Sequence, residues 1–491
     1  MAVFDMTVHE DVLATTVKLA QDRNIIIPTF AQQKDPSLVP DKVKARLQGV
    51  GLWDVNPINL FRITWHNDVK TGLYGDVNYI ELPSSITGIK ARVVGIVGKY
   101  FPTGTHKVGA AFGCLVPQLV TGHFDPTRQA AVWPSTGNYC RGGAFDCALL
   151  ATDAVAILPE GMSKERFDWL REIGTKEVIG TPGTESNVKE IYDKVHELKT
   201  TRGDGIVVFN QFEEFGNALW HYDMTGSAFE QVFNAIKGPR SRMAGYVSAT
   251  GSAGTISAGE YLKKVYPYSH ITAVEALQCP TLYANGFGAH RIEGIGDKHV
   301  PWIHNVRNTD AVAAIDDEYP MHLLRLFNEE AGKAYLEKKG VPRELIEQLN
   351  LMGISSLANM VAAIKMAKYE EMDENDVVFT VFTDSADLYL SRIEELRAEY
   401  GPYTEMDAAL DYAKYLEGIL TDWYRELSYR DRKQLHNLKY FTWVEQQGRT
   451  AEELRQLWDP DFWVGVFAQA QQWDRLIEAF NAETGLLAEL E

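Results

Sequence analysis

Short apolar runs alternate with helical stretches through the middle of the chain, and this alternation predicts its architecture. The first set of strand-like runs lies at 130–133, 154–159, 177–180 and 205–210. The second set lies at 244–249, 270–276 and 377–382. Strands that alternate with helices in this way predict α/β layers built on parallel sheets.

The first hundred residues follow a different pattern. A helix is predicted over 9–22, and a linker rich in Pro and Lys follows at 36–44. We interpret this part as an arm that packs on the body or on another subunit. Short apolar runs separated by Gly, Asn and Asp then predict strands over 56–97.

Past Ser391 the strand pattern stops, and the last hundred residues are predicted to be helical. Capping boxes are predicted at 404–407 and 450–453. Aromatic residues are dense in this extension, which is typical of a core or an interface. Its tryptophans are Trp423, Trp443, Trp458, Trp463 and Trp473.

The composition is that of a soluble globular protein, with 45% hydrophobic and 23% charged residues in a chain of 491. The net charge of −19 argues against a nucleic-acid partner, because phosphate binding needs a basic surface. The four cysteines have no metal-ligand spacing and fit a reducing, cytoplasmic compartment. The N-terminus carries acidic residues where a signal peptide is basic, and no long apolar run occurs, so we expect no membrane span.

Lys107 is the main candidate for covalent chemistry. The apolar run 91–97 predicts a strand, Pro102 and Gly104 predict a turn, and small residues after Lys107 predict a tightly packed helix. A single lysine is most often a solvated surface charge. Here small and apolar neighbours would desolvate the amine, which lowers the pKa of a lysine and makes it a nucleophile. Such a lysine suits Schiff-base formation with a carbonyl, including the aldehyde of pyridoxal phosphate (PLP).

Two stretches rich in Gly and hydroxyl groups could hold the rest of a ligand. PSTGNY, 134–139, follows a predicted strand and offers a carboxylate cradle, although the same residues also make ordinary turns. SATGSAGTISAGEYLKK, 248–264, opens a predicted helix, and its glycines let the backbone approach an anion. It lacks the lysine of a Walker loop and the spacing of a dinucleotide fold, so a single phosphate is the expected ligand.

Two later stretches complete the set. HRIEGIGDKHVP, 290–301, predicts a tight loop that lines a cleft. GISSLANMVAAIKMAKY, 353–369, places Ser355 before a long predicted helix, where a serine is about as often an N-cap as a functional group. The sequence contains no metal-binding motif, and we predict no metal.

Taken in this order, these stretches resemble the fold-type II PLP enzymes, the tryptophan synthase β family, and are most similar to its cysteine synthase and cystathionine β-synthase branch. The likeness runs from about Asn56 to Ser391. It includes PEGMSKERFDWLREIG at 159–174, QFEEFGNALWHYDMTG at 211–226 and FTDSADLYLS at 382–391.

The resemblance implies a role for individual residues. Lys107 would form the Schiff base with the cofactor and later remove the α-proton, and Asn138 would hydrogen-bond the cofactor's 3-hydroxyl. Ser355 would face the pyridine nitrogen. The phosphate would lie in the cradle Gly251, Ser252, Ala253, Gly254 and Thr255. The substrate would be bound by Ser135, Thr136, Gly137 and Tyr139, and the hydroxyls of the first two would hold its carboxylate.

A serine opposite the pyridine nitrogen would affect how strongly the cofactor ring withdraws electrons. A hydroxyl cannot keep the ring protonated as a carboxylate would, so the ring is a weaker electron sink. Loss of a β leaving group is then expected, and transamination is not. The chain departs from the family pattern at Tyr139, Cys140 and Arg141 and again at Asp297 and Lys298. These positions would lie near the substrate, and we hypothesise that Arg141 pairs with an anionic substrate side chain.

The leading interpretation is an enzyme that performs α,β-elimination or β-replacement on cysteine, serine or an O-activated serine. One alternative is a serine/threonine dehydratase or an ammonia-lyase of the same fold, although the loop GSAGT looks more like that of the sulfhydrylases. A less favoured alternative is a non-catalytic structural partner that works through its Trp-rich extension. Product analysis separates elimination from replacement.

The resemblance also implies an architecture, with the cofactor between two α/β domains and a homodimer as the usual assembly. We expect an N-terminal arm (1–50), a larger PLP-binding domain (51–100 and 214–392), a smaller mobile domain (101–213) and a helical C-terminal extension (393–491).

Overall fold

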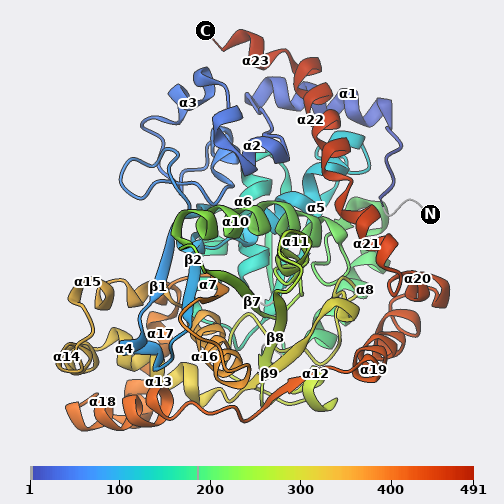
Figure 1. The fold of residues 1–491 in the computed structure, drawn as a ribbon. Coiled ribbons are helices and arrows are strands. Elements are labelled where there is room, and N and C mark those ends of the chain that lie inside the picture. The colour runs from blue at the N-terminus through green and yellow to red at the C-terminus, as the bar shows by residue number, and fades with distance from the viewer. Residues whose placement is uncertain (1–3, 136, 185–186, 491) are drawn as a thin grey trace.

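The computed structural model describes residues 4–135, 137–184 and 187–490, and two sheets form its body (Figure 1). The larger sheet has the order β1-β2-β10-β7-β8-β9-β11 and the smaller has the order β5-β4-β3-β6. The strands of the larger sheet are β1 (Tyr79–Leu82), β2 (Arg92–Val97), β7 (Arg242–Ala249), β8 (His270–Ala276), β9 (Ala311–Ile315), β10 (Asp376–Phe382) and β11 (Tyr424–Glu426). Those of the smaller sheet are β3 (Ala130–Pro134), β4 (Asp153–Pro159), β5 (Glu177–Thr181) and β6 (Ile206–Val208).

Parallel pairing dominates both sheets, as the alternating pattern predicts. Every pair in the smaller sheet is parallel, and only β1 with β2 and β9 with β11 run antiparallel at the edges of the larger one. Strand β10 lies between β2 and β7, and all its residues are buried. A strand that reads VVFTVF without polar alternation is the kind that a parallel sheet covered on both faces requires. The predicted α/β fold class is therefore confirmed.

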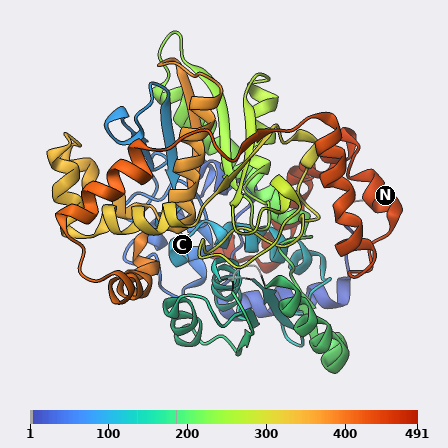
Figure 2. The ribbon, with the colours of Figure 1, turned by 90° about the horizontal axis from the view of Figure 1, so that it is seen from below.

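Helices cover the faces of both sheets. The first are α1 (Glu10–Arg23), α2 (Phe30–Lys34), α3 (Asp41–Leu47), α4 (Ser84–Thr87) and α5 (Lys107–Thr121). The next are α6 (Asn138–Leu149), α7 (Lys164–Glu172), α8 (Val188–Arg202), α9 (Phe215–Trp220), α10 (Gly226–Ile236), α11 (Ser257–Val265) and α12 (Thr281–Ala284). The remaining ones are α13 (Glu318–Asn328), α14 (Glu330–Lys338), α15 (Arg343–Ile346), α16 (Ile354–Tyr369), α17 (Leu390–Tyr400), α18 (Glu405–Tyr412), α19 (Tyr429–Lys439), α20 (Ala451–Gln456), α21 (Pro460–Phe467), α22 (Ala470–Thr484) and α23 (Leu486–Glu489). In Figure 2 the helices around the smaller sheet lie on one side of the molecule and the strands of the larger sheet on the other.

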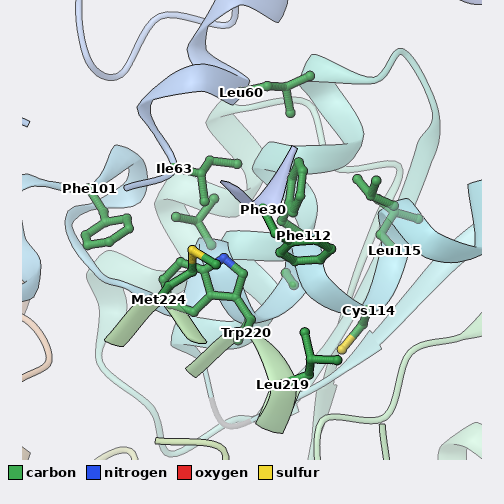
Figure 3. Packing of buried hydrophobic residues seen from close by; sticks show 14 of the residues in the cluster. Phe30, Leu60, Ile63, Phe101, Phe112, Cys114, Leu115, Leu219, Trp220 and Met224 are labelled. Carbon is green, nitrogen blue, oxygen red and sulfur yellow. The ribbon is translucent and has the colours of Figure 1, made fainter. Parts of the chain in front are cut away.

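Helix α5 is buried along almost its whole length, and its glycines explain how closely it packs (Figure 3). A Cβ at Gly109 would lie 2.0 Å from Cζ2 of Trp220, and a Cβ at Gly113 would lie 2.6 Å from the carbonyl oxygen of Gly216. Glycine costs stability inside a helix, but here it lets α9 approach the backbone of α5. The lysine at the start of α5 is thereby held on a rigid element.

Two predictions of local structure are wrong. The predicted linker 36–44 contains a 3₁₀ turn and the beginning of α3. Val43 and Leu47 of this helix are fully buried, and their packing holds the segment in place. Strands do not stop at Ser391, because β11 pairs with β9. Both predicted capping boxes, at Thr404 and Thr450, are confirmed.

The C-terminal extension packs against the first thirty residues of the chain. Asn481 on α22 donates to the carbonyl oxygen of Ile27 at 2.7 Å and accepts from its N–H at 3.1 Å. Asp474 on the same helix accepts from the N–H groups of Phe30 and Ala31. Figure 1 shows α22 beside α1 and α2. Trp443, Trp463 and Trp473 are buried, which confirms a core role for these three.

Among the described residues no single helix combines the length and the apolar composition of a membrane span. One pair of helices, Arg343–Leu351 and Ile354–Tyr369, meets these criteria together, but it is bent by 119° at the break.

Candidate active site

Lys107 lies at a strand-to-helix junction, as predicted. Strand β2 ends at Val97, and the chain turns through Thr103 and Gly104, whose φ angles are +69° and +71°. Helix α5 then begins at Lys107. Two successive residues in the left-handed region make the sharp turn that presents the lysine between the two sheets.

A cavity lies where the carboxyl ends of strands from both sheets meet. Ligand sites in parallel sheets form at this edge. The predicted residues that line the cavity are Lys107, Ser135, Asn138, Tyr139, Gly251, Ser252, Thr255 and Ser355. Residues not predicted for the site that also line it include His106, Gln211, Asn359 and Thr383.

The amine of Lys107 points into the predicted phosphate cradle. Its Nζ lies 3.2 Å from Oγ of Ser252 and 3.4 Å from Oε1 of Gln211. The amide of Asn217 donates to the same Oγ at 3.0 Å and so fixes the serine. The amine and the cradle, which are 145 residues apart in the sequence, are thus parts of one site.

The cradle itself fits a small anion. A Cβ at Gly251 would lie 2.5 Å from the carbonyl oxygen of Gly294, and a Cβ at Gly254 would lie 2.0 Å from Oδ1 of Asn217. Ala253 has a φ of +63°, so the loop is tightly curled before it enters α11. Backbone N–H groups in such a loop, followed by a helix N-terminus, favour an anion. Ala253 and Gly254 do not line the cavity themselves, but they set the shape of the loop that does.

Asn138 opens α6 on the opposite wall of the cavity. Its Nδ2 donates to Oδ2 of Asp384 at 2.7 Å, and its Oδ1 is buried with no hydrogen-bond partner among the described residues. Gly137 precedes it with a φ of +142°, and a Cβ there would lie 2.4 Å from Nη1 of Arg166. The Oγ of Ser135 accepts from the N–H of Gly137 at 3.0 Å.

The positions of Thr136, Ser355 and Arg141 differ in how they compare with the predictions. Thr136 lies outside the described residues. Ser355 is the second residue of α16, whose N-cap is Gly353, so the predicted place of Ser355 before the helix is wrong. Arg141 is absent from the cavity lining and buried, and its guanidinium lies 4.7 Å from the ring centroid of Trp169 and 5.9 Å from that of Trp53. The structure therefore does not support the hypothesis that Arg141 meets a substrate side chain in this cavity.

A group of polar side chains, all buried except the partly exposed Arg392, lies beside the cavity, and we term it the buried charge cluster. It consists of Arg166, Glu293, Asp384, Tyr389 and Arg392. Nη1 of Arg166 lies 3.3 Å from Oε2 of Glu293, and its Nη2 donates to the hydroxyl of Tyr389 at 3.0 Å. That hydroxyl donates to Oδ2 of Asp384 at 2.7 Å, and Nε of Arg392 donates to Glu293 at 2.7 Å. The cluster joins α7, next to the smaller sheet, to residues that follow β10.

Two titratable groups in the cavity have strongly perturbed acidity. Burial raises the pKa of the Asp297 carboxyl to about 8, and the charge of Lys107 opposes this shift. Burial and then Lys107 hold the pKa of the His106 imidazole well below its usual range, so this ring is neutral. Neither residue is predicted as a site residue from the sequence, although Asp297 and Lys298 stand where the family pattern has small or aromatic residues.

The residues present fit PLP. Several buried polar atoms of the lining have no hydrogen-bond partner among the described residues: Oδ1 of Asn138, Oδ2 of Asp297, Oδ1 of Asn359 and both ring nitrogens of His106. Buried polar groups are rarely left so, and these call for a polar ligand. Lys107 would meet the aldehyde, the cradle would hold the phosphate, and Ser355 would offer a neutral hydroxyl to the ring nitrogen.

The comparison with protein families identifies the class. Residues 99–384 match the profile of the family described as "Pyridoxal-phosphate dependent enzyme". The chain belongs to this family and is a PLP-dependent enzyme, which confirms the predicted cofactor and the resemblance drawn from the sequence.

Individual relatives refine this result. The chain is 32% identical to the cysteine synthase of Staphylococcus aureus over 325 residues, which cover 66% of this chain and 96% of that protein. It is 25% identical to the cystathionine β-synthase of Saccharomyces cerevisiae, over 64% of this chain and 59% of that one. Its fold is similar to that of the cysteine synthase of Entamoeba histolytica, with a TM-score of 0.56 at 20% identity over 70% of this chain and 93% of that one.

Proposed function

We propose that the protein catalyses β-replacement on a small L-amino acid with an oxygen-linked leaving group, such as O-acetyl-L-serine, in the manner of a cysteine synthase. The observation that carries this proposal is the position of Lys107, whose amine lies 3.2 Å from Ser252 of the phosphate cradle in a cavity between both sheets. The identity with cysteine synthases over most of their length supports the same reaction.

Different side chains of the cavity have different roles in the proposed reaction. PLP supplies the aldehyde and an electron-withdrawing ring when it is bound. Lys107 takes the proton from the substrate α-carbon and returns it at the end, because its amine is the base nearest to the cradle. Ser135 and the N-terminus of α6 hold the substrate carboxylate. Ser355 presents a hydroxyl that carries no charge, which favours loss of a β substituent over transamination.

The same family likeness supports a homodimer and a cytoplasmic location, and we include both in the proposal. The smaller sheet is formed entirely by residues between 130 and 208, and this supports a smaller domain, 101–213, that closes on the substrate. Sedimentation of the purified protein tests the dimer. Small-angle scattering with and without O-acetyl-L-serine tests closure.

The proposed reaction is tested by spectroscopy and product analysis. We expect a yellow protein whose absorption shifts on addition of O-acetyl-L-serine, and a Lys107→Ala variant in which the yellow species and the shift are lost. With sulfide added, L-cysteine is the expected product. Pyruvate and ammonia alone would instead support an elimination enzyme of the dehydratase type, and a protein that stays colourless with added PLP would refute catalysis.

A further inference from the structure

Asp297 is held in a fixed position in the wall of the cavity. It follows Gly296, whose φ is +81°, and Thr281 donates its hydroxyl to the carbonyl oxygen of Asp297 at 2.6 Å. The N–H of Gly296 donates to the carbonyl oxygen of Thr250 at 3.2 Å, so the loop is tied to the residues that follow β7. The side chain is only 6% exposed and lines the same cavity as Lys107. It is built into the site rather than placed on a free loop.

The carboxyl of Asp297 has no structural partner that accounts for its burial. Its Oδ2 has no hydrogen-bond partner among the described residues, and none of them forms an ion pair with it. The titratable groups that face it are Lys107, Tyr192, Cys279 and the neighbouring His299. Burial keeps the tyrosine, the thiol and the imidazole neutral, because it raises the pKa of the first two and lowers that of His299 to about 3. Lys107 is therefore the one cation acting on Asp297 among the described residues.

A buried carboxyl with a free oxygen beside a reacting centre is the arrangement of a general acid or base. We propose that Asp297 is a second catalytic residue, which transfers the proton at the β-carbon while Lys107 transfers the proton at the α-carbon. The proposal rests on the proposed function and extends its substrates to amino acids whose β substituent is an unactivated hydroxyl or thiol, as in L-serine and L-cysteine.

The proton balance of this reaction is simple. The bond between the β-carbon and the leaving oxygen or sulfur breaks, and the carboxylic acid of Asp297 gives its proton to that atom, so water or hydrogen sulfide departs. A neutral nucleophile, a thiol or water, then forms its bond to the β-carbon and returns its proton to the Asp297 carboxylate. Nothing is oxidised or reduced, and the residue ends in its starting state.

An activated ester does not need this proton. Acetate leaves as a stable anion, and hydrosulfide attacks as an anion that a nearby carboxylate would repel. A carboxyl that is largely protonated near neutral pH, since its pKa lies at about 8, therefore makes little difference to O-acetyl-L-serine but assists a poor leaving group. The acid form disappears as the pH rises through this pKa, so turnover of L-serine should fall there.

The test compares two substrates in Asp297→Asn. We expect kcat/KM for release of hydrogen sulfide from L-cysteine to fall by about a hundredfold or more. The rate of the absorption change with O-acetyl-L-serine should stay within about threefold of the wild type. The fall of L-serine turnover above pH 8 should be absent from the variant. Glu275→Gln is the matched control, because burial also raises the pKa of Glu275 to about 8, but this residue binds the N–H groups of Leu282 and Tyr283 and does not line the cavity.

The infrared spectrum of the cofactor-free protein gives a readout without turnover. The protonated carboxyl absorption that titrates near pH 8 should lose one component in Asp297→Asn and a different component in Glu275→Gln, because burial raises the pKa of Glu275 and of Glu214 to about 8 as well. Equal losses with both substrates, no loss with either, or a wild type that uses O-acetyl-L-serine but neither unactivated amino acid would overturn the proposal. A wild type that uses none of the three substrates would instead refute the proposed function.

Discussion

The cavity and the buried charge cluster lie side by side, yet their buried polar side chains differ in how many partners they have. In the cluster, Arg166, Glu293 and Asp384 are buried and each has partners at 2.7 to 3.3 Å, while Oδ1 of Asp384 has none among the described residues. In the cavity, atoms of Asn138, Asp297 and His106 are buried without partners among the described residues. A paired network fixes a structure, whereas unpaired buried groups cost stability and await a ligand. The comparison separates residues that hold the site from residues that work in it.

Within the part of the chain that the structure describes, a hydrogen bond between Asp384 and Asn138 joins the two regions. Asp384 accepts from Tyr389 within the cluster and from Asn138 in the cavity wall. The amide of Asn138 is thereby turned so that Nδ2 faces the cluster and Oδ1 remains for the cavity. The cluster thus positions a side chain of the cavity lining as well as joining α7 to residues that follow β10.

The largest effect is expected in the cavity, from Lys107→Ala. Loss of the amine should lower turnover of O-acetyl-L-serine by about 10³-fold or more, because the reaction then lacks both its covalent anchor and its base. The urea midpoint of the cofactor-free protein should hardly change. Steady-state kinetics and urea denaturation of the same preparation check both points. A large loss of stability would contradict the separation of roles.

In the cluster, Arg166→Ala should instead lower the stability of the cofactor-free protein. It leaves Glu293 buried beside Arg392 alone and removes a donor from Tyr389, and breaking a buried ion pair costs about 3–5 kcal/mol. Urea denaturation measures the loss. Lys164→Ala on the same helix removes an exposed ion pair with Asp168 and is the control, since such pairs contribute little. Equal midpoints for the two variants would contradict a structural role for the cluster.

Asp297→Asn should stabilise the cofactor-free protein, but only at raised pH. The folded-state pKa of about 8 lies above the unfolded value, so the folded state binds more protons from about pH 4 to pH 8 and its stability falls across that window. The substitution removes this fall and should add up to about 5 kcal/mol at pH 9. Denaturation at pH 5 and pH 9 tests it, and a gain of equal size at both would point to packing rather than charge.

Ser391→Ala should have the smallest effect and defines the edge of the cluster. Its hydroxyl donates to Oε2 of Glu165 at 2.7 Å, next to Arg166 and Arg392 in the sequence, and both partners are partly exposed. Loss of this bond should cost about 0.5–1.5 kcal/mol, as for an ordinary hydrogen bond. A denaturation midpoint as low as that of Arg166→Ala would extend the cluster to these residues.

Local sequence signals predict the strands, turns and helices that carry the site. They do not predict the contacts between segments that are far apart in the sequence. The strand, turn and helix around Lys107 follow from apolar runs, Pro102 and small residues, and the cradle follows from its glycines. Strand β11 is missed because its three residues, Tyr424–Glu426, gain their order from pairing with β9. The cluster is missed because Arg166 and Tyr389 are 223 residues apart and look like ordinary surface residues in sequence. The sequence alone indicates Asp297 only as a residue that departs from the family pattern, because its burial depends on the fold.

The bond between Asn481 and Ile27 has a consequence for how the chain is made. These residues are 454 positions apart, and the segment 25–31 finds its partners on α22, near the end of the chain. The hydrogen bonds of this segment to α22 can form only after that helix has been synthesised, although His9 and Phe30 also have partners on α5. The packing of the N-terminal segment is therefore completed late in synthesis.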